Sequence, residues 1–332
     1  MTEFPAESLK NKIFDIAGHD EFNDLALEIF RYQAISNKVY RKYLEILEID
    51  KSTITKPEDI PFLPIELFKS HKIISGSARP EKKFESSGTT DTLKSKHYII
   101  DPGLYTSSFT KCFNLFYGSP EKYCILALLP SYLERKNSSL IFMVDRLIQM
   151  SNHKKSGFYL NNLSELSETL KRLENKEQPV ILLGVSFALV RMAENFPVHL
   201  ERTIIMETGG MKGRQEEIIR EELHELLRKA FHVNEIHSEY GMTELLSQAY
   251  STGQGLFQSP PWMKVMIRDT YDPRTYVPSG KSGGINIIDL ANIHSCSFIA
   301  TQDIGKMVPS GGFEVLGRFD NSDIRGCNLM LD

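Results

Sequence analysis

Hydrophobic positions in the first part of the chain recur at helical spacing. Between residues 22 and 48, apolar side chains repeat with the period that places them on one face of a helix. The predicted buried stripe comprises Leu25, Ile29, Tyr32, Tyr40, Tyr43 and Leu47. Prolines then punctuate residues 56–72, KPEDIPFLPIELFKSHK. Because proline restricts its own backbone and that of the preceding residue, we expect this segment to be extended.

The middle of the chain carries continuous apolar runs separated by helical patterns. The runs are YCILALL (123–129), PVILLGV (179–185) and TIIM (203–206), and each suits a strand buried on both faces. Helical patterns follow them at residues 139–150, 186–196 and 215–231. The last helix is predicted to bury Ile218, Ile219, Leu223, Leu226, Leu227 and Phe231. Strands that alternate with helices indicate an α/β fold with a mostly parallel sheet.

Beyond residue 250 the pattern changes to short apolar runs between glycines and prolines. These runs are WMKVMI, GINIIDL, SFIAT and FEVLG, and they predict twisted strands joined by turns. We therefore expect one core over residues 1–332, with a helical part (1–80), an α/β part (81–250) and a β-rich part (251–332).

Composition and charge narrow the class of protein. The chain has 332 residues, 41% of them hydrophobic and 25% charged, and a net charge of −4. This balance argues against a nucleic-acid binder, which usually has a basic excess. No apolar run is long enough to span a bilayer, and the N-terminus is not a secretory signal. The four cysteines, Cys112, Cys124, Cys296 and Cys327, show no metal-ligand spacing. We expect a cytoplasmic protein with free thiols.

A hydroxyl-rich stretch at residues 84–94, FESSGTTDTLK, is the first candidate site. A glycine among hydroxyls lets backbone N–H groups converge on an anion, and a following lysine adds positive charge. The candidate phosphate ligands are Ser86, Ser87, Gly88, Thr89, Thr90 and Lys94. A plain solvated loop explains the same composition, so the stretch alone leaves both interpretations open.

Three later segments favour nucleotide chemistry. In His237–Leu245, HSEYGMTEL, Tyr240 is a stacking platform for a base or a packing residue, and Glu244 is a Mg²⁺ ligand or an ordinary acid at a helix start. In TQDIG, Asp303 is suited to accept hydrogen bonds from a ribose diol. In GRFDNSDIRGC, Arg318 offers a planar set of donors.

The order SSGTTxxxK, YGMTE, TxDxG and GRxDxxxxRG resembles that of the adenylate-forming superfamily of acyl-CoA ligases, adenylation domains and luciferases. The resemblance runs from about Ser86 to Gly326. It implies the fold of the large N-terminal domain of these enzymes: two α/β subdomains and a β-rich subdomain. It also implies ATP and Mg²⁺ as cofactors. By this resemblance, the triphosphate would be bound by Ser86–Thr90 and Lys94, and adenine by Gly209, Gly210, Tyr240 and Gly241. Thr243 would contact the α-phosphate and Glu244 would bind Mg²⁺. Asp303 would bind the ribose, and Arg318 would lie near the ribose and the phosphate.

Within that superfamily the chain looks most like the acyl-protein synthetase branch, which is related to phenylacetate-CoA ligases. The segments IPFLPIELFK, ETGGMKGR and PPWMKVMIRD carry this likeness. The resemblance implies activation of a carboxylic acid, expected to be a fatty acid, and acyl transfer to Cys327 near the C-terminus. It also implies a partner protein that accepts or reduces the acyl group. The chain stops just after GRxD, so we expect the mobile C-terminal domain of larger relatives to be absent.

Other functions remain open at this level. Asp91 stands where relatives have glycine, and Leu93 where many have proline. An acid in a phosphate loop disfavours ATP unless it points away or helps to hold a metal ion. The rivals are an ATP-independent acyltransferase, a CoA ligase, and a non-catalytic subunit of an acyl-processing complex. Cys327 itself is either the acyl carrier or a small buried residue.

Overall fold

The structure is a computed structural model that describes residues 6–86, 93–130, 137–160, 162–209 and 219–319. The chain divides into two units, one formed by Met1–Ser77 with Pro261–Asp332 and the other by Ala78–Pro260. We call them unit 1 and unit 2. Within the described residues, every helix is too short or too polar to cross a lipid bilayer.

Unit 2 is built on a mainly parallel sheet with the strand order β10-β9-β8-β7-β6-β4-β5. Strands β4 to β8 run parallel, whereas β9 and β10 are antiparallel additions. A separate antiparallel hairpin pairs β2 with β3. The elements are β2 (Lys82–Glu85), β3 (Lys96–Ile99), α5 (Pro102–Tyr117), η4 (Pro120–Lys122), β4 (Cys124–Leu128), α6 (Ser139–Ser151), β5 (Gly157–Tyr159), α7 (Leu163–Glu174), β6 (Val180–Val185), α8 (Ser186–Asn195), β7 (Thr203–Thr208), α9 (Arg220–Phe231), β8 (His237–Tyr240), β9 (Ala249–Ser251) and β10 (Phe257–Gln258).

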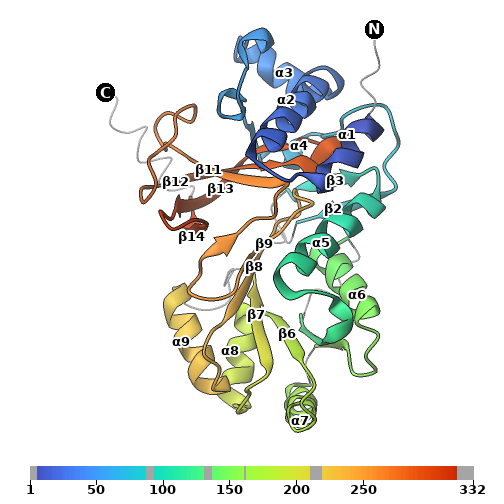
Figure 1. The fold of residues 1–332 in the computed structure, drawn as a ribbon, viewed down its shortest axis with the longest axis vertical. Coiled ribbons are helices and arrows are strands. Elements are labelled where there is room, and N and C mark those ends of the chain that lie inside the picture. Colours follow the sequence, from blue (N-terminus) through green and yellow to red (C-terminus); the bar gives the residue numbers. More distant parts are fainter. Residues whose placement is uncertain (1–5, 87–92, 131–136, 161, 210–218, 320–332) are drawn as a thin grey trace. The chain divides into compact units, whose positions relative to one another are not determined.

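The apolar runs of the sequence form the central strands of this sheet. Strands β4 and β6 are buried along their whole length. Helices α5 and α6 lie on one face of the sheet, and α8 and α9 lie on the other (Figure 1). This arrangement explains why the runs are continuous and do not alternate with polar residues, since both faces of the strands meet apolar helices.

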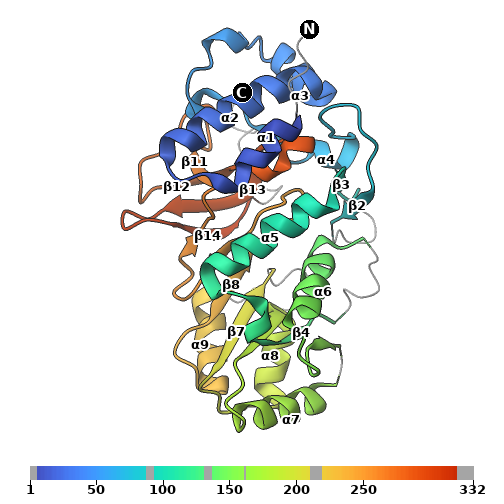
Figure 2. The same cartoon turned by 45° about the vertical axis from the view of Figure 1, so that its right-hand side comes forward.

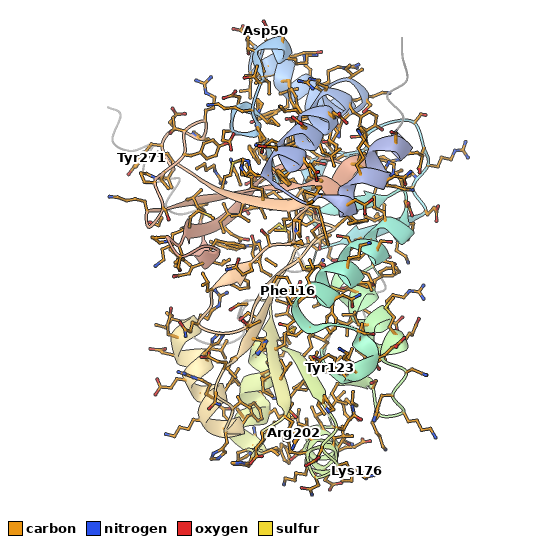
Figure 3. The ribbon with its side chains drawn as sticks, in the orientation of Figure 1. Asp50, Phe116, Tyr123, Lys176, Arg202 and Tyr271 are labelled. Carbon is orange, nitrogen blue, oxygen red and sulfur yellow. The ribbon has the colours of Figure 1, made fainter. Side chains whose placement is uncertain are left out.

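Lys176 and Arg202 both lie at the end of unit 2 near α7 (Figure 3).

Unit 1 joins the helical N-terminal part of the chain to the late strands. Its antiparallel sheet has the order β11-β12-β13-β14, and β1 pairs in parallel with β13. Figure 2 shows α1, α2 and α3 on the same side of the β11–β13 strands. The elements are α1 (Ala6–Lys12), η1 (Ile13–Asp15), α2 (His19–Ser36), α3 (Lys38–Ile46), η2 (Lys51–Thr53), η3 (Pro57–Asp59), β1 (Leu63–Pro64), α4 (Leu67–Ser70), β11 (Met263–Arg268), β12 (Ser282–Asp289), η5 (Leu290–His294), β13 (Phe298–Met307) and β14 (Phe313–Arg318).

Asn37 divides the helical pattern of residues 22–48 into α2 and α3. Its side-chain oxygen accepts from the backbone N–H groups of Val39 and Tyr40, which caps α3. Its amide nitrogen donates to the backbone oxygen of Ser295 at 2.7 Å. The predicted stripe continues through Tyr40 in α3 but was wrong at Leu47, which follows the last residue of α3 and is 38% exposed.

The core of unit 1 is aromatic where the N-terminal helices meet the late strands. The rings of Phe30, Tyr40 and Phe62 each lie 6.1–6.3 Å from the ring of Phe298 in β13. On the same side, the buried amide nitrogen of Gln33 donates to the backbone oxygens of Asn292 and Ile293. Buried polar groups are costly unless they are paired, so these bonds fix the register of α2 against η5.

Candidate active site

The hydroxyl-rich stretch connects the two strands of the β2–β3 hairpin. At its base the Ser86 N–H donates to the Ser95 backbone oxygen at 3.1 Å, and the Ser95 N–H donates to Ser86 Oγ at 3.0 Å. Ser86 therefore closes the segment at its start, in a position set by the register of β2 and β3. The predicted ligands Ser87, Gly88, Thr89 and Thr90 lie outside the described residues, as does Asp91.

Lys94 is exposed at the same hairpin. Glu85 at the end of β2 pairs with Lys83 at 2.6 Å. The hydrogen bond and charge of Lys83, together with the more distant charge of Lys94, hold the pKa of Glu85 below its ordinary value. The base of the loop thus carries cationic side chains beside one ionised acid.

The carboxyl ends of β7 and β8 carry two of the sequence segments, ETGG and HSEYGMTEL, and the neighbouring end of β6 contacts the first of them. Ser186, directly after β6, donates through Oγ to the backbone oxygen of Gly209, directly after β7, at 2.7 Å. Gly209 has a φ of +67°, and a Cβ built there meets no atom of the described residues within 4 Å. The left-handed backbone favours glycine at this position. Gly210 lies outside the described residues.

Tyr240 and Gly241 follow at the end of β8. The Tyr240 side chain is 8% exposed, and its ring lies 5.8 Å from the ring of Phe257 in an edge-on arrangement. A Cβ at Gly241 would lie 2.5 Å from Glu239 Oε1. A side chain at residue 241 would therefore have to displace that buried carboxyl group.

Thr243 and Glu244 occupy the centre of a turn that begins at Met242. The Leu245 N–H donates to the Met242 backbone oxygen at 3.2 Å, which closes the turn. The Thr243 backbone oxygen lies 2.9 Å from Nδ1 of the buried His97 in β3. The Glu244 side chain is 6% exposed.

The structure also shows a buried ionisable cluster that the sequence reasoning missed. Glu207 at the end of β7 lies 3.5 Å from Arg220 Nε and 3.8 Å from His224 Nε2. Burial alone would raise the pKa of Glu207, but the neighbouring His224 and the charge of Arg220 outweigh it and lower the pKa. Burial raises the pKa of Glu239 to about 7, although Thr208 donates a hydrogen bond to its carboxyl group.

A signal for this cluster was present in the sequence. Glu207 directly follows the apolar run 203–206 and Glu239 lies in the HSEYGMTEL segment, and these two segments form the adjacent parallel strands β7 and β8. Acids at the ends of neighbouring buried strands meet at one edge of a sheet, which is where α/β proteins bind ligands. Only the assembled sheet shows that these strands are neighbours.

In unit 1, Asp303 and Arg318 are cross-strand partners on β13 and β14. Arg318 Nε donates to Asp303 Oδ1 at 2.7 Å. The Asp303 side chain is 8% exposed and that of Arg318 is 49% exposed. The two predicted ribose ligands thus form one pair in which only the guanidinium faces solvent substantially.

A second arginine, Arg268, supports this part of β13. Its guanidinium donates to the backbone oxygens of Ile285 and Thr301 and to the side-chain oxygen of Asn286, at 2.6–2.8 Å. The register of β12 and β13 shifts between Gly284 and Asn286, so Arg268 satisfies acceptors beside the irregularity. Thr301 is two residues from Asp303, which makes Arg268 a structural support for the predicted ribose site.

The donor set fits Mg²⁺ only if substrate oxygens complete it. Among the described residues, no group of three or more His, Cys, Asp and Glu side chains is gathered as a metal site. Mg²⁺ in nucleotide enzymes is commonly held by one or two carboxylates together with phosphate oxygens and water. The buried Glu244 carboxyl group is compatible with that arrangement.

The three cysteines within the described residues, Cys112, Cys124 and Cys296, are free and buried. Burial raises the pKa of the Cys124 thiol to about 11 and that of the Cys296 thiol to about 12. Neither thiol is suited to nucleophilic chemistry at neutral pH. Cys327, the predicted acyl carrier, lies outside the described residues.

Comparisons with known proteins give a family and a fold. A family model described as "Acyl-protein synthetase, LuxE" matches residues 18–332. No curated protein sequence gives a significant match. Many solved structures match, among them ATP-bound MatB from Rhodopseudomonas palustris, with a TM-score of 0.56, 14% identity, and coverage of 74% of this chain and 49% of that chain.

Two further solved structures have the same fold. One is O-succinylbenzoate coenzyme A synthetase (MenE) from Bacillus subtilis in complex with AMP, with a TM-score of 0.50, 18% identity, and coverage of 74% of this chain and 50% of that chain. The other is 2-hydroxyisobutyryl-CoA ligase in complex with 2-HIB-AMP and CoA, with a TM-score of 0.65, 11% identity, and coverage of 91% and 71%. The chain spans about half the length of MatB and MenE. The α/β adenylate-forming fold predicted from the sequence is confirmed.

Proposed function

Because this chain belongs to the acyl-protein synthetase family, we propose that it activates a carboxylic acid with ATP and passes the acyl group to a cysteine thiol. One observation carries the proposal. Gly209 and the segment Tyr240–Leu245 follow neighbouring parallel strands at their carboxyl ends, and Ser186 ties the end of β6 to Gly209. This edge of an open α/β sheet is where such folds bind ligands.

In the first step, an oxygen of the substrate carboxylate attacks the α-phosphorus of ATP. The bond between the α-phosphorus and the bridging oxygen to the β-phosphate breaks, and pyrophosphate leaves. Such a displacement depends mainly on positioning and on the neutralisation of charge. In the proposal, Ser86–Thr90 and Lys94 hold the triphosphate and Thr243 contacts the α-phosphate.

The remaining nucleotide contacts follow from the same proposal. Gly209, Gly210, Tyr240 and Gly241 line the adenine site, while Asp303 and Arg318 hold the ribose and phosphate. Because the Tyr240 ring is 8% exposed and packs on Phe257, only a small part of it faces a base. Glu244 would hold Mg²⁺, which when bound neutralises phosphate charge.

In the second step, the thiolate of Cys327 attacks the carbonyl carbon of the acyl adenylate. The bond from that carbon to the phosphate oxygen breaks, AMP leaves, and a thioester remains; the thiol proton passes to solvent. Arg325, two residues away in the sequence, favours the thiolate by its charge. The proposed substrate is a fatty acid, and the thioester is proposed to serve a protein in the cytoplasm that accepts or reduces the acyl group.

The test is intact-protein mass spectrometry after incubation with Mg-ATP and a panel of fatty and aromatic acids. We expect an acyl adduct that requires ATP, is removed by hydroxylamine, and is missing in Cys327→Ser. Cys124→Ala, which removes a buried thiol, is the matched control and should keep the adduct.

The other outcomes select the rival functions. An adduct formed from acyl-CoA without ATP would replace the proposal with an acyltransferase. Release of free acyl-CoA when CoA is added, with no protein adduct, would indicate a CoA ligase. The absence of both adduct and pyrophosphate release with every acid would overturn the enzymatic proposal in favour of a non-catalytic subunit.

A further inference from the structure

In unit 2, residues of β3 and α5 form three hydrogen-bond contacts with the segment that follows Tyr240. Nδ1 of His97, in β3, lies 2.9 Å from the Thr243 backbone oxygen. In α5, Ser108 Oγ lies 3.1 Å from Ser247 Oγ, and the Cys112 thiol donates to the Gln248 backbone oxygen at 3.3 Å. Strand β3 and helix α5 are consecutive in the chain and follow the hydroxyl-rich stretch. Strand β3, which follows the hydroxyl-rich stretch, and helix α5, which comes next, therefore both contact the Thr243–Gln248 segment.

The bond from His97 has a defined direction. A backbone oxygen only accepts hydrogen bonds, so Nδ1 must carry the proton. Burial lowers the pKa of His97 to about 4, and the imidazole is therefore neutral at neutral pH. His97 is thus a neutral donor whose tautomer is set by Thr243.

The acceptor of this bond lies at a sensitive place in the turn. Thr243 and Glu244 are the two central residues of the turn that the Leu245 N–H closes on Met242. Type I and type II turns differ by a flip of the peptide plane between the central residues, and this plane carries the Thr243 oxygen. A type II turn needs positive φ at the second central residue, and Glu244 is not among the described non-glycine residues with positive φ. The bond from His97 holds the plane in the observed orientation.

We propose that His97 is a positioning residue that fixes the Thr243–Glu244 peptide plane and so couples the hydroxyl-rich hairpin to the ATP-handling turn. The proposal rests on the proposed function, in which Thr243 contacts the α-phosphate and Glu244 holds Mg²⁺. His97 itself touches neither group. A flipped plane would reverse the Thr243 carbonyl and the Glu244 N–H between these two residues while the fold remained intact.

The test compares three substitutions of His97. His97→Asn keeps a nitrogen at the same number of bonds from Cα as Nδ1, whereas His97→Gln keeps one at the place of Nε2, and His97→Phe keeps neither. We measure pyrophosphate release at varied ATP and varied carboxylic acid. In His97→Phe and His97→Gln, kcat should fall about tenfold to hundredfold, as expected for misplaced catalytic groups, while KM for the carboxylic acid stays unchanged. His97→Asn should recover most of kcat.

The control removes a hydrogen bond of unit 2 that does not involve the turn. Tyr123 donates through its hydroxyl to the Tyr117 backbone oxygen at 2.9 Å, and it lies beside the lower part of α5 in the view of Figure 3. Tyr123→Phe should lose a comparable amount of stability and keep kcat. If Tyr123→Phe lowers kcat as much as His97→Phe does, the effect is one of general stability and the proposal is wrong.

A second readout does not depend on catalysis. Amide hydrogen exchange of residues 240–248 should speed up in His97→Phe and remain slow in His97→Asn. Unchanged exchange in His97→Phe would overturn the inference even in an active enzyme. If the wild-type protein makes no adenylate and the His97→Phe variant still shows faster exchange, the proposed function is refuted. The role of His97 in the turn is then still supported.

Discussion

Asp303 and Arg318 face each other across β13 and β14, and Arg318 Nε donates to Asp303 Oδ1 at 2.7 Å. The pair holds the Asp303 carboxyl group in one orientation although β14 ends there. A carboxyl group fixed by an arginine retains a lone pair for further donors. In the proposed function these donors are the ribose hydroxyls.

Asp303→Asn should weaken ATP binding. The substitution replaces charge-assisted hydrogen bonds, each worth about 1.5–3 kcal/mol, so KM for ATP should rise by about tenfold to hundredfold. Titration calorimetry with ATP measures the same loss directly. Glu314→Gln is the matched control, because Glu314 pairs with Lys306 at 3.0 Å between the same two strands. This partly exposed pair should contribute less than about 1 kcal/mol to stability and nothing to ATP binding.

Glu239→Gln should change how stability depends on pH. The pKa of Glu239 is raised to about 7 in the folded state, so the folded protein holds a proton that the unfolded chain releases above its ordinary pKa of 4.5. Stability therefore falls as pH rises from about 4.5 to about 7, by an amount on the order of 3 kcal/mol. Glu239→Gln removes this slope and should be the more stable protein at pH 8.

Urea denaturation between pH 4.5 and 8 measures the effect. Glu225→Gln, which replaces an exposed glutamate of α9, should reproduce the wild-type pH dependence. A Glu239→Gln protein with an unchanged slope would mean that Glu239 has nearly the same pKa in the folded and unfolded states, and would contradict the prediction.

Gly241→Ala should destabilise the protein through Glu239. The added Cβ would lie 2.5 Å from Glu239 Oε1, so the carboxyl group or the backbone must move, at a cost of about 1–3 kcal/mol. The penalty should shrink in a Glu239→Ala background, where the obstacle is missing. Gly157→Ala is the control, since a Cβ there meets nothing within 4 Å. Equal penalties in both backgrounds would contradict the steric explanation.

Thiol labelling should distinguish Cys327 from the other cysteines. Cys112, Cys124 and Cys296 are buried, and burial raises the pKa of Cys124 to about 11 and that of Cys296 to about 12. With Ellman's reagent at pH 8, the native protein should show a fast reaction of one thiol, absent in Cys327→Ser. Urea should expose all four thiols. A fast phase that survives in Cys327→Ser would show that a buried thiol becomes accessible.

The strands were predictable from the sequence because their burial is nearly uniform. The runs at 123–129 and 179–185 became β4 (Cys124–Leu128) and β6 (Val180–Val185). The helix limits were less predictable, because caps and tertiary bonds decide them. Asn37 caps α3 and bonds Ser295, and no period in the sequence reports a partner so distant. Ile219 was predicted to be core but is 59% exposed, since it precedes the first helical residue of α9.

The site was predictable only as an order of segments. The sequence predicts site roles for Tyr240, Thr243, Glu244, Asp303 and Arg318, which stay predictions, and the structure brings the last two into direct contact. Sequence reasoning missed His97, Arg268 and Glu207, because each acts on a residue far away in the chain. Residue type and spacing indicate which chemistry is available, whereas supporting contacts depend on which strands become neighbours.

The chain order of unit 1 has a consequence for synthesis on the ribosome. Gln33 and Asn37 donate hydrogen bonds to the backbone oxygens of Asn292, Ile293 and Ser295. All of unit 2 lies in the sequence between these two groups of residues. At roughly 5–20 residues per second, the N-terminal helices emerge on the order of ten seconds before the strands that bury them. During that time Phe30 and Tyr40 lack the ring of Phe298, so the nascent chain exposes an apolar surface suited to capture by chaperones. Unit 2, which is continuous in the chain, is free to fold first.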